Sequence, residues 1–152
     1  MHLNITKFNT PSAKHYSLLL TADPSKKIIG SYLSHAFCYQ AITNAQLAGV
    51  IILLPTHPDT LEIMNIAVDS KWQNHGIAQQ LLSFAENLAH QQNYSYLEIG
   101  TGTTSFEQLY LYQKCGFRIT SVKRDFFTDR YDSEIIENGL HLKDMLRLKK
   151  VL

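Results

Sequence analysis

The most informative stretch of this chain is Val68-Asp69-Ser70-Lys71-Trp72-Gln73-Asn74-His75-Gly76-Ile77-Ala78. It begins where an apolar run, residues 63–68, ends, and a long amphipathic segment follows it. Its turn reads Gln73-x-x-Gly76-x-Ala78, with small residues where the backbone must come close to another group. Such a turn points several free amide N–H groups and the positive end of a helix dipole at one spot. This pattern predicts an anion site, of which a diphosphate is the usual occupant.

The composition is that of an ordinary globular chain. With 152 residues the chain suits a single domain covering residues 1–152, long enough to bury a sizeable core. A hydrophobic share of 45% with 18% charged residues argues against wholesale disorder. The formal net charge of +1 gives no broad electrostatic case for binding nucleic acid or an anionic membrane.

The sequence also lacks the signals of export and of metal binding. The N-terminus has no signal-peptide pattern, and no apolar run approaches the ~20 residues that span a bilayer. Cys38 and Cys115 have no metal-ligand spacing and are typical of reduced thiols in a cytosolic protein. The seven histidines are scattered, without a pair at ligand spacing. We therefore expect a cytoplasmic protein that binds no metal, no nucleic acid and no membrane.

Apolar periodicity and turn signals predict a mixed sheet with helices on its faces. The helices are expected to open at Thr10-Pro11, at Asp23-Pro24, at Gly76 and at Ser105, where Gln108 completes a capping box. They are expected to end near residues 20, 33, 92 and 115, respectively. Strands are expected over residues 3–8, 37–43, 47–54, 61–68, 96–101, 117–122 and 140–148. Asn44-Ala45 and Asn138-Gly139 are predicted turns, and residues 127–139 form a polar, acidic segment.

A second motif, Leu111-Tyr112-Gln113-Lys114-Cys115-Gly116-Phe117, follows the first at a fixed place in this order of elements. With the strand, Gln73-x-x-Gly76-x-Ala78 and the helix, it resembles the GNAT superfamily of acetyl-CoA-dependent N-acetyltransferases over nearly the whole chain. The resemblance implies an α/β (α+β) fold, with a mixed, mostly antiparallel sheet of about seven strands flanked by about four helices.

The resemblance implies acetyl-CoA as co-substrate, with its diphosphate on the backbone amides of the turn that follows Gln73. The pantetheine arm would pair with the backbone of the preceding strand, as an added strand does. The cofactor-binding residues would be Ile66, Ala67, Val68, Gln73, Asn74, His75, Gly76, Ile77 and Ala78. The alternative is a tight strand-turn-helix that binds nothing. The His75 side chain is expected to face solvent, because the family uses the backbone there.

The sequence departs from the family pattern after the strand at residues 96–101. Family members commonly carry an asparagine near the start of the next helix, and this chain has Gly102-Thr103-Thr104-Ser105. Thr104 or Ser105 could supply a hydroxyl to the cofactor instead, although helix capping explains Ser105 equally well.

Three residues are candidates for catalysis. A thiol leaves more easily when protonated, and the resemblance gives Tyr112 the role of proton donor to the sulfur. Tyr110, two residues earlier, is expected on another side of the helix. Glu62 and Glu98 are the nearest carboxylates to take a proton from the amine. The alternatives are a core aromatic for Tyr112 and solvent-facing strand residues for both glutamates.

The leading hypothesis is an enzyme that moves an acetyl group from acetyl-CoA to a primary amine. Direct attack in a ternary complex is expected, because no activated cysteine or serine is evident. The acceptor would be a small-molecule or peptide amine. Acidic residues 125–137 slightly favour a cationic acceptor, but they also suit a homodimer contact or a solvated loop. The alternative function is a non-catalytic acyl-CoA-binding sensor or interaction module. A nucleotide-binding domain is disfavoured, because no P-loop motif is present.

Overall fold

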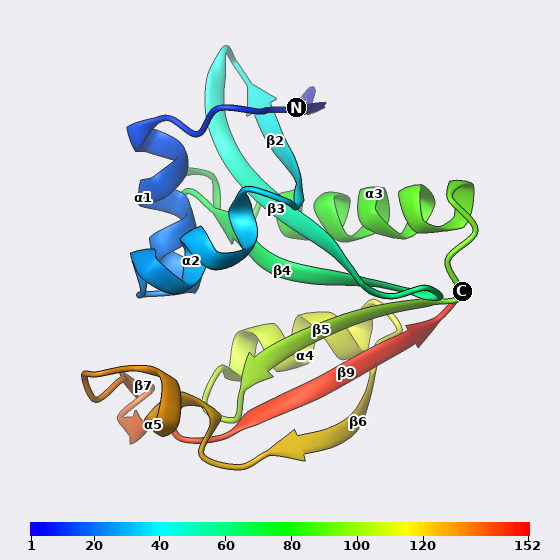
Figure 1. Cartoon of the computed structure of the whole chain (residues 1–152). Coiled ribbons are helices and arrows are strands. Elements are labelled where there is room, and N and C mark those ends of the chain that lie inside the picture. Colours follow the sequence, from blue (N-terminus) through cyan, green and yellow to red (C-terminus); the bar gives the residue numbers. More distant parts are fainter.

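A computed structural model describes residues 1–152, and seven of its strands form one mixed sheet (Figure 1). The strand order is β1-β2-β3-β4-β5-β9-β6, and only the β4–β5 pair is parallel. The strands are β1 Asn4–Lys7, β2 Phe37–Thr43, β3 Gln46–His57, β4 Thr60–Val68, β5 Tyr96–Gly102, β6 Arg118–Lys123 and β9 Met145–Val151. The prediction of a mixed, mostly antiparallel sheet is confirmed.

Helices cover both faces of this sheet (Figure 1). All helices of the chain are α1 Ala13–Ala22, α2 Lys26–Leu33, the 3-10 helix η1 Ser70–Trp72, α3 Ile77–Gln91, α4 Phe106–Lys114 and α5 Phe126–Arg130. Helices α1 and α2 pack on one face, whereas α3 and α4 pack on the other. None of the helices combines the length and the apolar character that a membrane crossing needs.

Strand β3 lies at the centre of the core. Because successive strand side chains point to opposite faces, Ile51 and Leu53 pack on the α3 side, and Val50 and Ile52 pack on the α1–α2 side. All four are fully buried. Its continuous apolar run therefore serves two hydrophobic cores at once, one on each face of the sheet.

Strands β4 and β5 separate part-way along their length. They pair in parallel only from Thr60–Ile63 on β4 to Tyr96–Ile99 on β5. On the other edge of β4, Ile52 faces Asn65 and Leu53 faces Ile63, so Met64 is an extra, bulged residue. A bulge bends its strand and raises the local twist. The two strands consequently diverge toward their C-terminal ends, which opens the sheet between them (Figure 1).

The first two helices start later than predicted. Ser12, not Thr10, caps α1: its Oγ accepts the His15 N–H, and the His15 ring accepts the Ser12 N–H in return. Ser25, not Asp23, caps α2 through the Ile28 N–H, and Asp23 ends α1. Both prolines lie outside the helices because the serine after each one can satisfy the first free amides.

The predicted strand over residues 140–148 is in fact two elements. β7 Ile136–Glu137 pairs with β8 Leu140–His141, and β9 starts only at Met145. The turn between β7 and β8 is confirmed, since Asn138 and Gly139 both have positive φ. The turn at Asn44-Ala45 is confirmed by the same sign of φ. Residues 124–144, named here the hairpin segment, also contain α5, which adds one helix to the predicted four.

Candidate active site

Two cavities meet at the opening between β4 and β5. The loop cavity, of about 390 Å³, lies between β4, the turn before α3, and α4. The wedge cavity, of about 580 Å³, lies between β4, β5, the α1–α2 loop and the hairpin segment. Both cavities are lined by Thr21, Ala22, Ile66, Gln108 and Tyr112. A molecule bound in one cavity therefore lies next to a molecule bound in the other.

The loop cavity brings together most of the predicted cofactor residues. Its lining includes Ile66, Ala67, Val68, Gln73, Asn74, Gly76, Ile77 and Ala78. The Gln73 side chain donates to the Val68 carbonyl over 3.3 Å, which fastens the turn to the end of β4. His75 lines neither cavity, and its exposed ring lies against the carbonyls of Trp72 and Gln73. Its predicted orientation toward solvent is confirmed.

Gly76 shapes the turn as an anion cradle. It is the N-cap of α3 with φ of 76°, and no side chain caps this helix. A Cβ built on Gly76 would meet no atom within 4 Å, so the space beside its backbone is open. The first N–H groups of an α-helix have no partner inside the helix, and the dipole favours negative charge beside them. These features suit the diphosphate of a coenzyme A.

Tyr112 lies at the junction of the two cavities. Tyr112 is 4% exposed, whereas Tyr110 is 68% exposed. The prediction that these two tyrosines lie on different sides of the α4 helix is confirmed. Burial alone raises the pKa of Tyr112 above its ordinary value, and no protein group hydrogen-bonds its hydroxyl. The phenol is therefore protonated at neutral pH and free to donate to a bound molecule.

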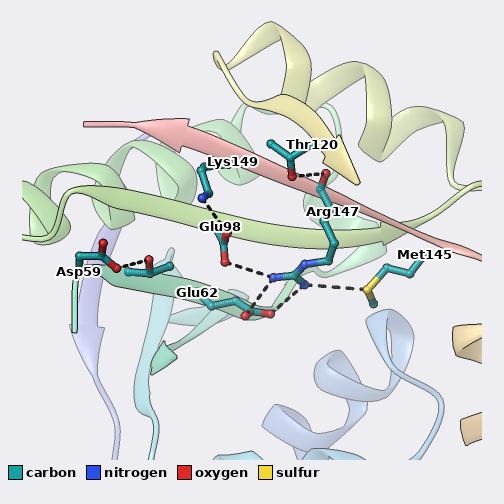
Figure 2. A network of polar contacts seen from close by, with 8 residues as sticks. Asp59, Glu62, Glu98, Thr120, Met145, Arg147 and Lys149 are labelled. Carbon is teal, nitrogen blue, oxygen red and sulfur yellow. Dashed lines mark hydrogen bonds and ion pairs between the residues drawn. The ribbon is translucent and has the colours of Figure 1, made fainter. Parts of the chain in front are cut away.

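Glu62 and Glu98 share one arginine (Figure 2). The Arg147 guanidinium lies 3.1 Å from each carboxylate oxygen of Glu62 and 3.5 Å from Glu98. Lys149 adds a second cation at 3.5 Å from Glu98. Glu62 lines the wedge cavity and Glu98 does not. The two predicted carboxylates are thus close together, but only one of them faces the place where an acceptor would bind.

Gly100 makes this arrangement possible. Arg147 on β9 stands opposite Gly100 on β5, yet its main partner, Glu62, is one strand further, on β4. A Cβ on Gly100 would lie 2.8 Å from the Arg147 guanidinium and 2.7 Å from the Met145 sulfur. The missing side chain therefore lets the guanidinium lie across β5 and tie β9 to β4 where the sheet begins to open.

Thr104 and Ser105 are both engaged by the hairpin segment. The Thr104 hydroxyl donates to Glu137 over 3.0 Å, and the Ser105 hydroxyl donates to the same oxygen over 2.6 Å. The predicted capping box at Ser105 is wrong, because the Ser105 side chain makes no hydrogen bond to the first amides of α4. Its hydroxyl bonds the Glu137 carboxylate instead, and a hydrogen bond to a charged group is stronger than one to a neutral amide. Thr104 lines neither cavity, so the geometry lends no support to its predicted cofactor contact.

A family model described as Acetyltransferase (GNAT) family matches residues 7–117, which include both sequence motifs. The chain belongs to the GNAT acetyltransferase family. It is 50% identical over 133 residues to the uncharacterized N-acetyltransferase YvbK of Bacillus subtilis (strain 168), with 88% of this chain and 86% of YvbK covered.

Two solved GNAT structures match almost the whole chain. The Bacillus subtilis acetyltransferase in complex with CoA is 46% identical, with a TM-score of 0.95 and 99% of each chain covered. A GNAT family acetyltransferase from Elizabethkingia anophelis with acetyl-CoA bound is 45% identical, with a TM-score of 0.94. That match covers 99% of this chain and 98% of the other.

Several lining residues of this GNAT site were not predicted from the sequence. The most informative is Asn65, which follows Leu61 and Ile63 in the buried series of β4. A polar residue in such a series was a usable signal, because buried amides need partners. No sequence signal marked Thr21, Ala22 and Asp23, whose place beside β4 depends on how α1 docks on the sheet.

Proposed function

We propose that this GNAT protein transfers the acetyl group of acetyl-CoA to a primary amine by direct attack in a ternary complex. The observation that carries this proposal is the junction of the two cavities at Ile66 and Tyr112. The loop cavity would hold acetyl-CoA, with the diphosphate on the amides of residues 74–78 and the pantetheine along residues 66–68. The wedge cavity would hold the acceptor, a small-molecule or peptide amine. The relatives solved with CoA and with acetyl-CoA support acetyl-CoA as the co-substrate.

The residues at the junction fit acyl transfer. Acetyl-CoA supplies an activated acetyl group as a thioester; attack by the amine forms the C–N bond and breaks the C–S bond. Tyr112 would donate its proton to the departing sulfur, since burial keeps the phenol protonated. A backbone N–H of residues 66–68 would stabilise the negative charge that develops on the thioester oxygen.

Direct attack is favoured because neither cysteine is placed to carry the acetyl group. Cys38 is buried in the core beneath α1 and α2, and Cys115 lines neither cavity. Burial raises the pKa of both thiols, although Lys150 and Lys114 partly oppose this effect at Cys115. A thiol must ionise to become a nucleophile, so a covalent acetyl-enzyme on either residue is disfavoured.

Initial-velocity kinetics test this proposal. Thiol release would be measured over a panel of primary amines, with acetyl-CoA and the amine both varied. Lines that intersect in the double-reciprocal plot are expected for a ternary complex, whereas parallel lines would point to a covalent intermediate. Tight acetyl-CoA binding without acetylation of any amine would support the sensor or interaction module instead.

We propose Glu62, rather than Glu98, as the group that receives the amine proton, directly or through a water. Each carboxylate oxygen has a second lone pair beyond the one facing Arg147. Glu62→Gln is expected to lower kcat by about a hundredfold, the usual size of a general-base effect. Glu98→Gln is the matched control, because it also removes one charge beside Arg147. An equal loss in both variants would mean that the ion-pair network acts structurally and that Glu62 is not the base.

A further inference from the structure

The wedge cavity contains polar groups that the proposed reaction does not use. We propose that the acceptor carries an anionic group in addition to its amine, and that Lys123 and Arg130 bind this group at the mouth of the cavity. This inference rests on the proposed function, since it concerns the acceptor of the same acetyl transfer. It is carried by an unpartnered buried oxygen at one end of the cavity and by unpaired cations on other elements of its wall.

The unpartnered oxygen marks the amine end. Asn65 is 4% exposed and lines the wedge cavity beside Ile66, which also lines the loop cavity. Its amide nitrogen donates to the Leu19 carbonyl and to the Tyr32 hydroxyl, both over 3.1 Å. The carbonyl can only accept, so the orientation of the amide is fixed, and the Asn65 Oδ1 is left without a partner. A buried unpaired oxygen is costly, so this part of the wall, next to the thioester, favours a hydrogen-bond donor on the acceptor.

The carboxylates that line the wedge cavity differ in the groups that balance their negative charge. Glu62 is paired with Arg147, and Glu137 accepts the two hydroxyls from the start of α4. Asp23 accepts the Tyr131 hydroxyl over 2.8 Å and the Ser25 N–H, but no cation lies within 4 Å of it. Since Asp23 follows Ala22, which lines both cavities, its uncompensated charge favours an ammonium group that approaches the junction.

The cations without partners come from other elements. Lys123 ends β6 and Arg130 ends α5, and neither has a carboxylate within 4 Å. Both side chains are exposed, and the Arg130 guanidinium is held 4.4 Å above the Phe126 ring. Arg147, the remaining cation of the lining, is neutralised by its two glutamates. The free positive charge of the cavity wall is therefore that of Lys123 and Arg130, which a carboxylate or phosphate would bind.

Aromatic rings also line the wedge cavity. The ring centroids of Phe126 and Phe127 are 5.1 Å apart, and those of Phe127 and Tyr131 are 5.7 Å apart. All three residues line the wedge cavity. An apolar or aromatic body would pack against them, with its amine toward Asn65 and its anion toward Lys123 and Arg130.

Four matched amines test the inference. These are para-methylphenethylamine, para-(aminoethyl)benzoate, tyramine O-phosphate and para-(aminomethyl)phenethylamine, which share the ring and the amine but differ in the para group. Their dissociation constants would be measured calorimetrically with the protein saturated by CoA, and their kcat/KM with acetyl-CoA. At least one anionic amine is expected to have a dissociation constant about tenfold lower, and a kcat/KM about tenfold higher, than the methyl analogue, as two exposed ion pairs allow. The two anionic probes distinguish a carboxylate from a phosphate.

Variants separate recognition from general effects. A Lys123→Gln, Arg130→Gln double variant is expected to remove this preference while changing the methyl analogue by less than about twofold. Arg124→Gln is the control, because Arg124 is an exposed neighbouring cation that lines neither cavity. An equal loss on all four amines, a preference for the diamine, or binding of none of them to the CoA complex would overturn the inference. Acetylation without anion preference leaves the proposed function standing, whereas failure to bind acetyl-CoA would defeat that function itself.

Discussion

Replacing Gly76 with glutamate is expected to raise the dissociation constant of acetyl-CoA by at least about a hundredfold, or about 3 kcal/mol. The residue sits at φ of 76°, where a side chain adds about 1–2 kcal/mol of strain. Its surroundings are open, so the side chain fits without a clash and the protein should fold. The new carboxylate would lie beside the free amides of α3 and repel the diphosphate that we place there. Calorimetric titration with acetyl-CoA, free CoA and ATP measures the effect.

Gly139→Glu provides the matched control. Gly139 has φ of 75°, an equally open surrounding and a place in the β7–β8 turn, outside both cavities. It introduces the same strain and the same charge, so it should leave acetyl-CoA affinity unchanged. If both variants bind acetyl-CoA as the parent does, the turn before α3 is not the diphosphate site. If both lose binding, the loss reflects destabilisation rather than the site.

Tyr112→Phe is expected to lower kcat by about a hundredfold while the dissociation constant of acetyl-CoA changes by less than about twofold. The hydroxyl has no partner within the protein, so its removal should cost little stability and act on the chemical step. Because burial raises the pKa of Tyr112, the phenol stays protonated well above neutral pH. The parent enzyme should therefore show no alkaline decline in kcat from this residue between pH 7 and about 9. Stopped-flow or steady-state thiol release over this range is the measurement.

Tyr110→Phe is the control for the Tyr112 variant. It removes the same atom from the same helix, two residues away and on the exposed side. Its kcat should equal that of the parent. Retention of full kcat in Tyr112→Phe would show that solvent or another group protonates the sulfur, and that Tyr112 only fills the junction.

The sequence predicted the features that depend on neighbours along the chain. The turn at Gly76, the different helix sides of Tyr110 and Tyr112, and the two positive-φ turns follow from short motifs, so they could be recognised locally. The predicted start of α1 was wrong because Thr10 and Ser12 are both suitable N-cap residues. Only the hydrogen bond from the Ser12 N–H to the His15 ring selects Ser12. Asn65 was not predicted as a site residue. Whether a polar residue on β4 can be buried depends on its hydrogen-bond partners, and those of Asn65 come from α1 and α2.

Contacts between distant segments limited the prediction of the site. Glu137 accepts hydrogen bonds from the hydroxyls of Thr104 and Ser105, which lie 33 and 32 residues earlier in the chain. No local sequence pattern indicates these contacts. The Arg147 pair with Glu62 requires the register of three strands and the absence of a side chain at Gly100. Whether Glu62 and Glu98 face an acceptor could be asked only once that register was known.

The empty position at Gly100 also constrains how this protein can diverge. Any side chain there would displace the Arg147 guanidinium, and an arginine without access to Glu62 would leave a half-buried carboxylate uncompensated. We therefore expect a relative that carries a side chain at position 100 to differ at positions 147 and 62 as well. The three positions are thus expected to vary together, although they lie on three separate strands and up to 85 residues apart in the chain.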